Sequence, residues 1–285
     1  MKKGFKLVLT AIAIVALTTG CDKNKGSGGG DPIKKMIPSE IKNIRADGNY
    51  VYTYKFLYDN KNRITEVKEV FDEEVRYVKI FTYDGIGRLI SITSHKSTEH
   101  SNDYIISFSY SENYVFISDT EKGDVGKLEV KNGKFIKAYY NYGDVAVHTL
   151  TITYDSRGNA TKFSYINGME IFINYENKKG IYSGINIPSW FLLLNFLIDG
   201  QLIFQSVNNS SSIKAVYGGW KYITENYYED YDNDYPIKMK IANKEYSSVK
   251  KSKVLPIFDL KEESLMLISD DDYDFYYEIK YIEAK

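Results

Sequence analysis

The sequence predicts an all-β protein, a large antiparallel meander that forms a curved sheet or a soluble barrel, with one short buried helix near residues 189–199. Three observations predict this fold class. Aromatic side chains occupy every second position from residue 50 to residue 58, which is the spacing of a strand with one buried face. Turn motifs rich in Asp, Asn and Gly separate such runs along the chain. The 285 residues also include 27 tyrosines, a residue type that suits a pleated surface that is part buried and part wet.

The N-terminus has the build of a secretory signal peptide over residues 1–20. Three lysines precede an apolar run, residues 7–17, that is too short to span a bilayer. Cys21 follows directly and is the only cysteine in the chain. The segment resembles the lipobox of bacterial lipoproteins, in which such a cysteine is lipidated and becomes the new N-terminus, although Leu17 stands one position further from the cysteine than that family favours. An ordinary cleaved signal with an unrelated cysteine is the alternative.

Two further segments follow from composition. Residues 21–37 are expected to comprise the lipidated cysteine and a flexible tether, because residues 22–31 have no apolar side chain to order them. Residues 38–285 are expected to form a single β domain, since 43% hydrophobic and 26% charged residues are an ordinary globular balance.

The turn that starts at Tyr83 is the motif around which the chain is organised. Asp84 can accept hydrogen bonds from the backbone that follows it, and Gly87 tolerates the positive φ that hairpin loops need. Looser copies of this turn begin at three further tyrosines, Tyr58, Tyr154 and Tyr231. Asn62 and Gly158 take the place of Gly87 in two of them, and both residue types tolerate a left-handed backbone. One repeat is therefore about one hairpin, which predicts a meander.

Strand patterns cover most of the remaining chain. They are expected at residues 50–58, 63–71, 75–83, 88–95, 104–110, 113–118, 127–131, 134–140, 147–154, 162–166, 170–175, 201–207, 213–217, 219–228, 236–242, 264–269 and 273–282. Tight turns are expected at 111–113, 131–133 and 167–168, the last an Asn-Gly pair.

Residues 189–200 break this pattern with a nearly continuous apolar run. Pro188 precedes a plausible cap at Ser189, and Gly200 is a plausible stop, so a short helix is expected. Periodicity cannot separate a helix from a buried strand over so few residues, and a buried strand is the alternative. In either form the run is expected to pack on the concave face of the sheet.

Two resemblances follow from these motifs. The Tyr-Asp-x-x-Gly-Arg-Leu turn at Tyr83 is similar to the YD (RHS-type) repeats of β-rich cell-surface shells and toxins. The whole layout resembles a bacterial lipoprotein family of unknown function described as having a porin-like fold. That layout is the lipobox and tether, turns at Tyr58, Tyr83 and Tyr154, the Asn167-Gly168 pair, the 175–180 turn, the Trp190 segment and residues 235–239. The resemblance implies a large curved or closed antiparallel sheet and no particular activity.

Charged residues inside the expected strands favour a soluble barrel over a membrane-spanning one. The strands of a transmembrane barrel present an apolar face to lipid. Charges stand within the strands expected here, at Glu66, Lys68, Arg76, Lys79, Lys127 and Glu129.

Chemical motifs are sparse. Asp230, Asp232 and Asp234 alternate like the start of a calcium loop, but Tyr235 and Ile241 replace the sixth-place Gly and twelfth-place Glu of such loops, so an acidic hairpin turn is the competing interpretation. The sequence has no phosphate-cradling glycine loop, zinc-protease motif or serine elbow, and it indicates no catalytic residue and no cofactor.

The aromatic row admits a functional interpretation. Tyr50, Tyr52 and Tyr54 could stack on a glycan or a peptide, or simply pack across strands. We therefore expect a protein of the cell envelope, held at the outer membrane by its lipid anchor, with a binding or scaffold role. Alternatives are a glycan-acting hydrolase that uses distant carboxylates, and a carrier of an apolar ligand with a cavity near Trp190. No basic patch with interleaved aromatics is present, which argues against a nucleic-acid partner.

Overall fold

The computed structural model describes residues 34–45, 48, 51–97, 103–121, 123–142, 145–191, 207–217, 220–248, 265–269 and 275–285. Residues 1–33, which include Cys21 and the expected signal peptide, lie outside this part of the chain. The described strands are β1 (Met36–Arg45), β2 (Val51–Tyr58), β3 (Ile64–Phe71), β4 (Glu74–Tyr83), β5 (Leu89–Lys96), β6 (Tyr104–Ser111), β7 (Tyr114–Asp119), β8 (Gly123–Lys131), β9 (Lys134–Tyr142), β10 (Val145–Tyr154), β11 (Ala160–Tyr165), β12 (Glu170–Lys179), β13 (Asn208–Tyr217), β14 (Trp220–Asp232), β15 (Tyr235–Ser248), β16 (Leu265–Ser269) and β17 (Phe275–Glu283).

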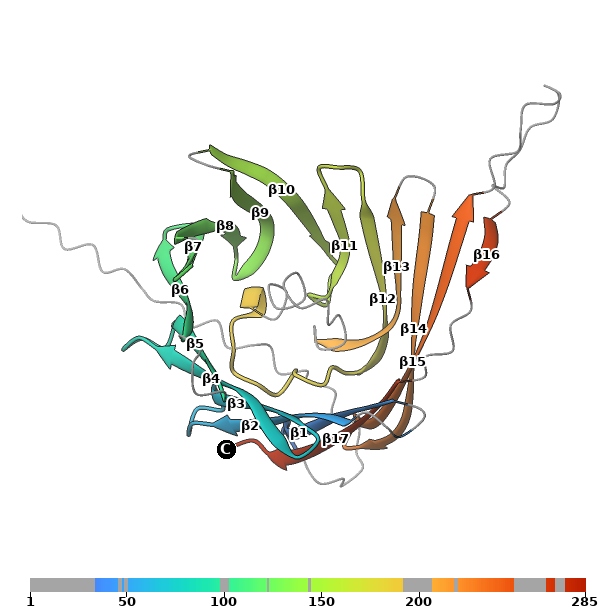
Figure 1. Cartoon of the computed structure of the whole chain (residues 1–285), viewed down its shortest axis with the longest axis horizontal. Coiled ribbons are helices and arrows are strands. Elements are labelled where there is room, and N and C mark those ends of the chain that lie inside the picture. The colour runs from blue at the N-terminus through green and yellow to red at the C-terminus, as the bar shows by residue number, and fades with distance from the viewer. Residues whose placement is uncertain are drawn as a thin grey trace, which may run out of the picture. The chain divides into compact units, whose positions relative to one another are not determined.

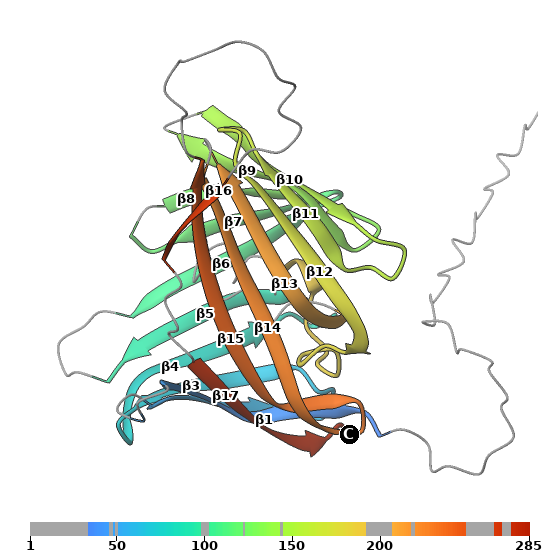
Figure 2. The same cartoon turned by 90° about the vertical axis from the view of Figure 1, so that its right-hand side faces the viewer.

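Sixteen of these strands close into one antiparallel barrel. Each strand from β1 to β15 pairs with the next along the chain, β15 then pairs with β17, and β17 pairs with β1. The remaining strand, β16, pairs with the second half of β15. Figure 1 shows the ring of strands, and Figure 2 shows β12 to β15 side by side as long tilted strands. The predicted meander is confirmed, and closure decides between the curved sheet and the barrel.

The strand that closes the barrel, β1, was not expected from the sequence. The predicted tether ran to residue 37, whereas β1 begins at Met36 and the folded unit at Lys34. Pro38 interrupts any regular pattern there, and it sits beside a register shift between Pro38 and Glu40, where a residue without a ladder N–H is tolerated. The boundary of the β domain therefore lies a few residues earlier than composition indicated.

The repeated turns are built as the sequence predicts. Asp84 Oδ1 accepts hydrogen bonds from the backbone N–H groups of Ile86 at 3.1 Å and Arg88 at 2.8 Å, and the Gly87 N–H donates to the Asp84 carbonyl. Gly87 has φ +91°, and the equivalent Asn62 and Gly158 have φ +59° and +98°. The expected left-handed position is confirmed at these three of the four copies, whereas Tyr235, at the equivalent place in the Tyr231 copy, is not left-handed.

The outer wall of the barrel carries ion pairs, both within and between strands, while alternate residues form the core inside. Ion pairs on this face join Lys42 and Lys280 to Glu40, Lys68 to Glu66, Lys137 to Glu129, Lys162 to Glu170, and Lys238 to Glu229. Their chain neighbours, such as Ile41, Val67 and Met239, are buried. This alternation matches the polar outer wall that the charged strand residues predicted.

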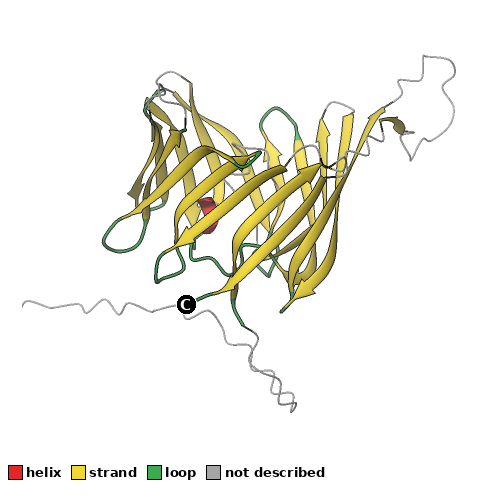
Figure 3. Cartoon of the chain, turned by 60° about the horizontal axis from the view of Figure 1, so that its bottom comes forward, coloured by secondary structure: helices red, strands yellow, loops and turns green. Residues whose placement is uncertain are grey.

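Residues 180–191 run through the interior of the barrel and end in a helical turn at 189–191, drawn red in Figure 3. The Trp190 ring lies 5.1 Å from Phe108, and the Phe191 ring lies 5.7 Å from Phe81, measured between centroids. Gly184 packs directly against the Met36 carbonyl, where an added Cβ would clash, so this segment touches the β1 backbone. The helix start at Ser189 and the inward packing of Trp190 are confirmed, whereas residues 192–206, including most of the strand expected at 201–207, lie outside the described residues.

Within the described part of the chain, no helix is both long enough and apolar enough to cross a membrane.

Candidate functional site

Seven inward-facing tyrosines form what we call the tyrosine ring, near the end of the barrel that carries the repeated turns (the turn end). Each hydroxyl donates a hydrogen bond of 2.6–2.9 Å to a backbone carbonyl near the start of the preceding strand. The donor–acceptor pairs are Tyr58 to Pro38, Tyr83 to Ile64, Tyr110 to Leu89, Tyr154 to Phe135, Tyr175 to Ala160, Tyr228 to Ser210 and Tyr281 to Pro236. Burial raises the pKa of Tyr110 to about 12, so the phenol stays neutral at physiological pH. These hydroxyls serve the fold.

The arginine of each early turn connects it to the next member of the ring. Arg63 is paired with Asp59 through its guanidinium at 2.6 Å and lies 4.4 Å from the centroid of the Tyr83 ring. Arg88 repeats the arrangement, since it pairs with Asp84 and lies 4.6 Å from the Tyr110 ring. Each of these two arginines therefore forms an ion pair with the aspartate of its own turn and a cation–π contact with the ring tyrosine of the next hairpin.

A second group of inward residues, the luminal wall, lies towards the opposite end, which we call the loop end. It comprises Tyr52, Tyr54, Glu69, Tyr77 and Lys79. In the register, Tyr54 faces Glu69 and Glu69 faces Tyr77. These residues share a face with Phe56, Val67 and Phe81 of the core, because an even number of residues separates them along uninterrupted stretches of strand.

The luminal wall combines stacked rings with a buried ion pair. The Tyr52 hydroxyl donates to Glu69, which also forms an ion pair with Lys79, whose ammonium nitrogen lies 2.6 Å from the carboxylate. Glu69 is only 8% exposed. Of the six strand charges named from the sequence, Lys79 is the one that faces inward. The Tyr52 and Tyr54 rings lie 5.0 Å apart. These two tyrosines lie on the same strand, and the cross-strand contact of the row is that of Tyr52 with Phe71 of β3, at 6.4 Å between ring centroids. Tyr50 lies outside the described residues, and ligand stacking stays a prediction.

The interior at the loop end is accessible to solvent. Tyr77 faces inward opposite Glu69, Tyr140 faces inward opposite Gly126, and Tyr222 faces inward opposite Ala215. Their exposed fractions are 36%, 48% and 43%. Side chains on the inner face of a completely filled barrel would be covered, so these values indicate open space beside the wall.

Further inward polar groups lie towards the same end of the barrel. Tyr104 donates a hydrogen bond of 3.1 Å to Asp119, and desolvation followed by that hydrogen bond raises the pKa of Tyr104 above its ordinary value. Asn43 faces Tyr52 across the ladder, and its buried side-chain oxygen has no hydrogen-bond partner within the described part of the chain. An unpartnered buried acceptor is costly unless water or a ligand meets it.

The acidic triplet forms part of a tight turn. Asn233 and Asp234 both have positive φ, +51° and +69°, which is the geometry of a two-residue hairpin turn. The hydrogen bond from Lys178, at 2.6 Å, holds the pKa of Asp234 below its usual value. Asp232 accepts a hydrogen bond from Asn233, and Asp230 is a positive-φ residue within β14. No cluster of three or more metal-ligating side chains occurs among the described residues, so the turn interpretation fits and the calcium interpretation gains no support.

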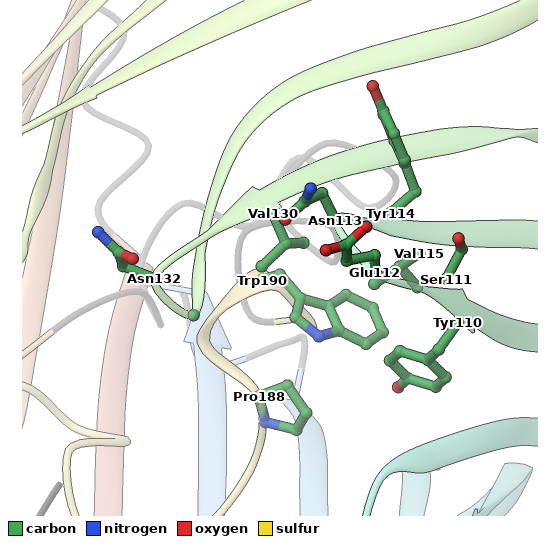
Figure 4. A pocket seen from close by; sticks show the side chains of 11 residues that line it. Tyr110, Ser111, Glu112, Asn113, Tyr114, Val115, Val130, Asn132, Pro188 and Trp190 are labelled. Carbon is green, nitrogen blue, oxygen red and sulfur yellow. The ribbon is translucent and has the colours of Figure 1, made fainter. Parts of the chain in front are cut away.

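A pocket of about 400 Å³ lies at the turn end, beside Trp190 (Figure 4). Tyr110, Val115 and Val130 contribute to its inner lining, and the β6–β7 and β8–β9 turns contribute polar groups such as Glu112 and Asn132. It stands where the sequence placed the cavity of the carrier alternative, but its lining is mixed rather than apolar.

Comparisons with known proteins identify structures of similar layout. No protein-family model matches the sequence, and no curated protein matches it. A porin-like protein from Bacteroides uniformis ATCC 8492 matches with a TM-score of 0.39 and 11% identity, over 88% of this chain and 98% of that one. A porin-like protein from Bacteroides vulgatus ATCC 8482 matches with a TM-score of 0.38 and 10% identity, over 87% of this chain and 99% of that one.

Sequence reasoning missed the inward pair of Glu69 and Lys79. The signal was the strand phase: Glu69 is two residues from Val67, and Lys79 is two residues from Phe81. Two opposite charges on the buried phase of adjacent strands indicate an internal ion pair, whereas charges on the other phase indicate a solvated wall.

Proposed function

We propose that this protein is a lipid-anchored barrel of the cell envelope that binds a hydroxyl-rich ligand, a glycan, in the loop-end interior. The observation that carries the proposal is the partial exposure of Tyr77, Tyr140 and Tyr222 inside a closed barrel. A tyrosine offers a ring face for stacking and a hydroxyl for hydrogen bonding, so inward tyrosines suit a ligand with both apolar faces and polar edges.

A polar group beside the luminal wall supports the same ligand class. Glu69 is held in place by its contacts with Lys79 and Tyr52. Near them, the buried side-chain oxygen of Asn43 has no hydrogen-bond partner among the described residues. A glycan hydroxyl can donate a hydrogen bond to such an oxygen.

The test uses two tyrosines of β14 on opposite faces. Tyr222 faces inward and Tyr227 outward, and they are similarly exposed, at 43% and 49%. We expect a glycan library to yield a ligand whose affinity falls about three- to tenfold in Tyr222→Ala, the loss of one partly exposed contact, and stays unchanged in Tyr227→Ala. An equal loss in both variants, or binding that neither variant affects, would place the ligand elsewhere. Binding of peptides but not of glycans would show that the ligand is a peptide and not a glycan.

The anchor is proposed from sequence alone. Cys21 stands at the end of the expected signal peptide, and two or more acyl chains hold a protein to a membrane at ~0.8 kcal/mol per buried methylene. Changing Cys21→Ala is expected to move the protein from the membrane fraction to the soluble fraction. Retention of the variant in the membrane would contradict the anchor without affecting the ligand proposal.

Turnover of a bound glycan would favour the hydrolase alternative. In that event Glu69→Gln and Asp119→Asn are the first variants to assay, because these are inward carboxylates of the described barrel with low exposure.

A further inference from the structure

The tyrosine ring has a vacant place on β8. In successive hairpins, the ring tyrosine at the end of one strand faces the first buried residue of the next: Tyr58 faces Ile64, Tyr83 faces Leu89 and Tyr154 faces Ala160. A register shift immediately precedes each of these pairs. On β8 and β9 the same shift precedes the pair of Val130 and Phe135. Val130 therefore stands where the other hairpins have tyrosine.

The ring also defines where the missing hydroxyl would bond. Five of the seven ring tyrosines donate to the residue that faces the ring tyrosine before it. Of the other two, Tyr154 donates to Phe135, which faces Val130 itself. Tyr281 donates to Pro236, which faces Tyr231. Tyr83 donates to Ile64, which faces Tyr58, and Tyr110 donates to Leu89, which faces Tyr83. The residue that faces Tyr110 is Val115. A phenol in the vacant place would accordingly lie against Val115 and donate to its carbonyl.

The 400 Å³ pocket occupies this vacancy. Val130 and Val115 both line it, and Tyr110, the preceding member of the ring, lines it from the side (Figure 4). Trp190 closes it from the interior, where its ring also contacts Phe108 and Tyr110 at centroid distances of 5.1 and 6.3 Å. The replacement of tyrosine by valine thus coincides with a cavity in the size range of small-molecule sites.

The segment that carries Trp190 is fixed beside the pocket. Ser189 donates a hydrogen bond of 3.0 Å to the Gly133 carbonyl in the β8–β9 turn, and the Phe191 N–H donates to the Pro188 carbonyl. Pro188 is itself part of the lining. The aromatic wall is therefore held in place by the turn that follows Val130.

We propose that this vacancy is a binding site for a phenol ring, inserted as the ring tyrosines are, with its hydroxyl towards Val115. The apolar walls suit the ring, and Ser111, Glu112 and Asn132 at the rim suit polar substituents outside it. The ring could come from a free phenolic compound or from a tyrosine side chain of a peptide, because both present the same chemistry. The site is separate from the luminal wall, so it does not depend on the glycan proposal.

The test measures binding of 4-ethylphenol, with ethylbenzene as the probe that lacks the hydroxyl. Trp190 fluorescence reports occupancy in a Trp220→Phe background, because Trp190 lines the pocket. We expect saturable binding of 4-ethylphenol and binding of ethylbenzene weaker by about three- to tenfold, the loss of one hydrogen bond. Tighter binding of a tyrosine-containing peptide than of 4-ethylphenol would identify a peptide as the source of the ring.

Val130→Tyr is the decisive variant because it completes the tyrosine ring. It is expected to abolish 4-ethylphenol binding and to raise the melting temperature, whereas Val147→Tyr, at an exposed valine, is expected to leave binding unchanged. Val130→Phe fills the ring position without the hydroxyl and is expected to block binding as well. The proposal would be overturned if the wild-type protein did not bind 4-ethylphenol, or bound ethylbenzene equally well. It would also be overturned if Val130→Tyr still bound 4-ethylphenol. A lower melting temperature of Val130→Tyr would overturn it too, because it would show that Trp190 already fills the ring position.

Discussion

Replacement of Gly87 by valine tests how the repeated turns shape the barrel. Gly87 has φ +91°, a conformation that a β-branched residue adopts only under strain, so Gly87→Val is expected to lower the free energy of unfolding by about 1–3 kcal/mol. A Cβ at this position would also lie 3.2 Å from a guanidinium nitrogen of Arg63, the side chain that stacks on Tyr83. The substitution therefore perturbs both the turn and the contact between neighbouring hairpins.

Two further variants separate these effects. Gly85→Val lies in the same turn, where an added Cβ meets nothing within 4 Å and the backbone is not left-handed, so a change within about 0.5 kcal/mol is expected. Gly87→Asn is expected to recover most of the stability, because Asn62 takes the equivalent place at φ +59°. Chemical denaturation followed by circular dichroism measures all three. Equal midpoints for Gly85→Val and Gly87→Val would refute the assignment of the strain to one position.

Three other predictions concern the ring and the inner segment. Tyr154→Phe removes the 2.6 Å hydrogen bond to the Phe135 carbonyl and is expected to cost about 1–3 kcal/mol in denaturation, since a buried acceptor loses its donor; a variant as stable as the wild type would show that the hydroxyl is dispensable. Burial raises the pKa of Tyr110 from 10.0 to about 12, so its contribution to the free energy of unfolding is fully present below pH 10 and is lost as the pH rises towards 12. Denaturation midpoints are therefore expected to fall over that range, and midpoints that stay constant to pH 12 would contradict this. Phe191→Ala is expected to cost about 3–5 kcal/mol, and Trp190 emission, read with Trp220→Phe, should be blue-shifted in the folded state; red-shifted emission that quenchers reach would place the segment at the surface.

The local pattern of the chain determined much of the fold. Alternation located β2 to β12 within a few residues, except that β8 begins at Gly123, earlier than expected. The repeated turns at Tyr58, Tyr83 and Tyr154 predicted the meander. The two-residue turn of Asp72 and Glu73, with φ +47° and +67°, had no glycine or asparagine to mark it. Such turns are imposed by the pairing of β3 with β4 rather than by local preference.

Closure of the barrel depends on contacts that no local pattern reveals. The pairing of β1 with β17 joins residues about 240 positions apart, such as Glu40 and Lys280, and β1 carries a proline. The luminal wall and the vacancy at Val130 likewise depend on strand pairing that the sequence alone does not reveal. Whether Tyr222 or Tyr227 faces inward depends on register with β13, and the role of Val130 emerges only when β8 is compared with its neighbours.

The closed barrel is expected to enclose an interior that small molecules can enter from the loop end. Single cysteines in place of Tyr222 and of Tyr227, in a Cys21→Ala background, test it by their rates of labelling with a small maleimide and with a bulky polyethylene-glycol maleimide. The structure predicts that the small reagent labels both positions and that the bulky reagent labels position 227 rapidly but position 222 slowly. Equal rates with the bulky reagent would contradict the claim, because Tyr222 would then face bulk solvent on an open sheet.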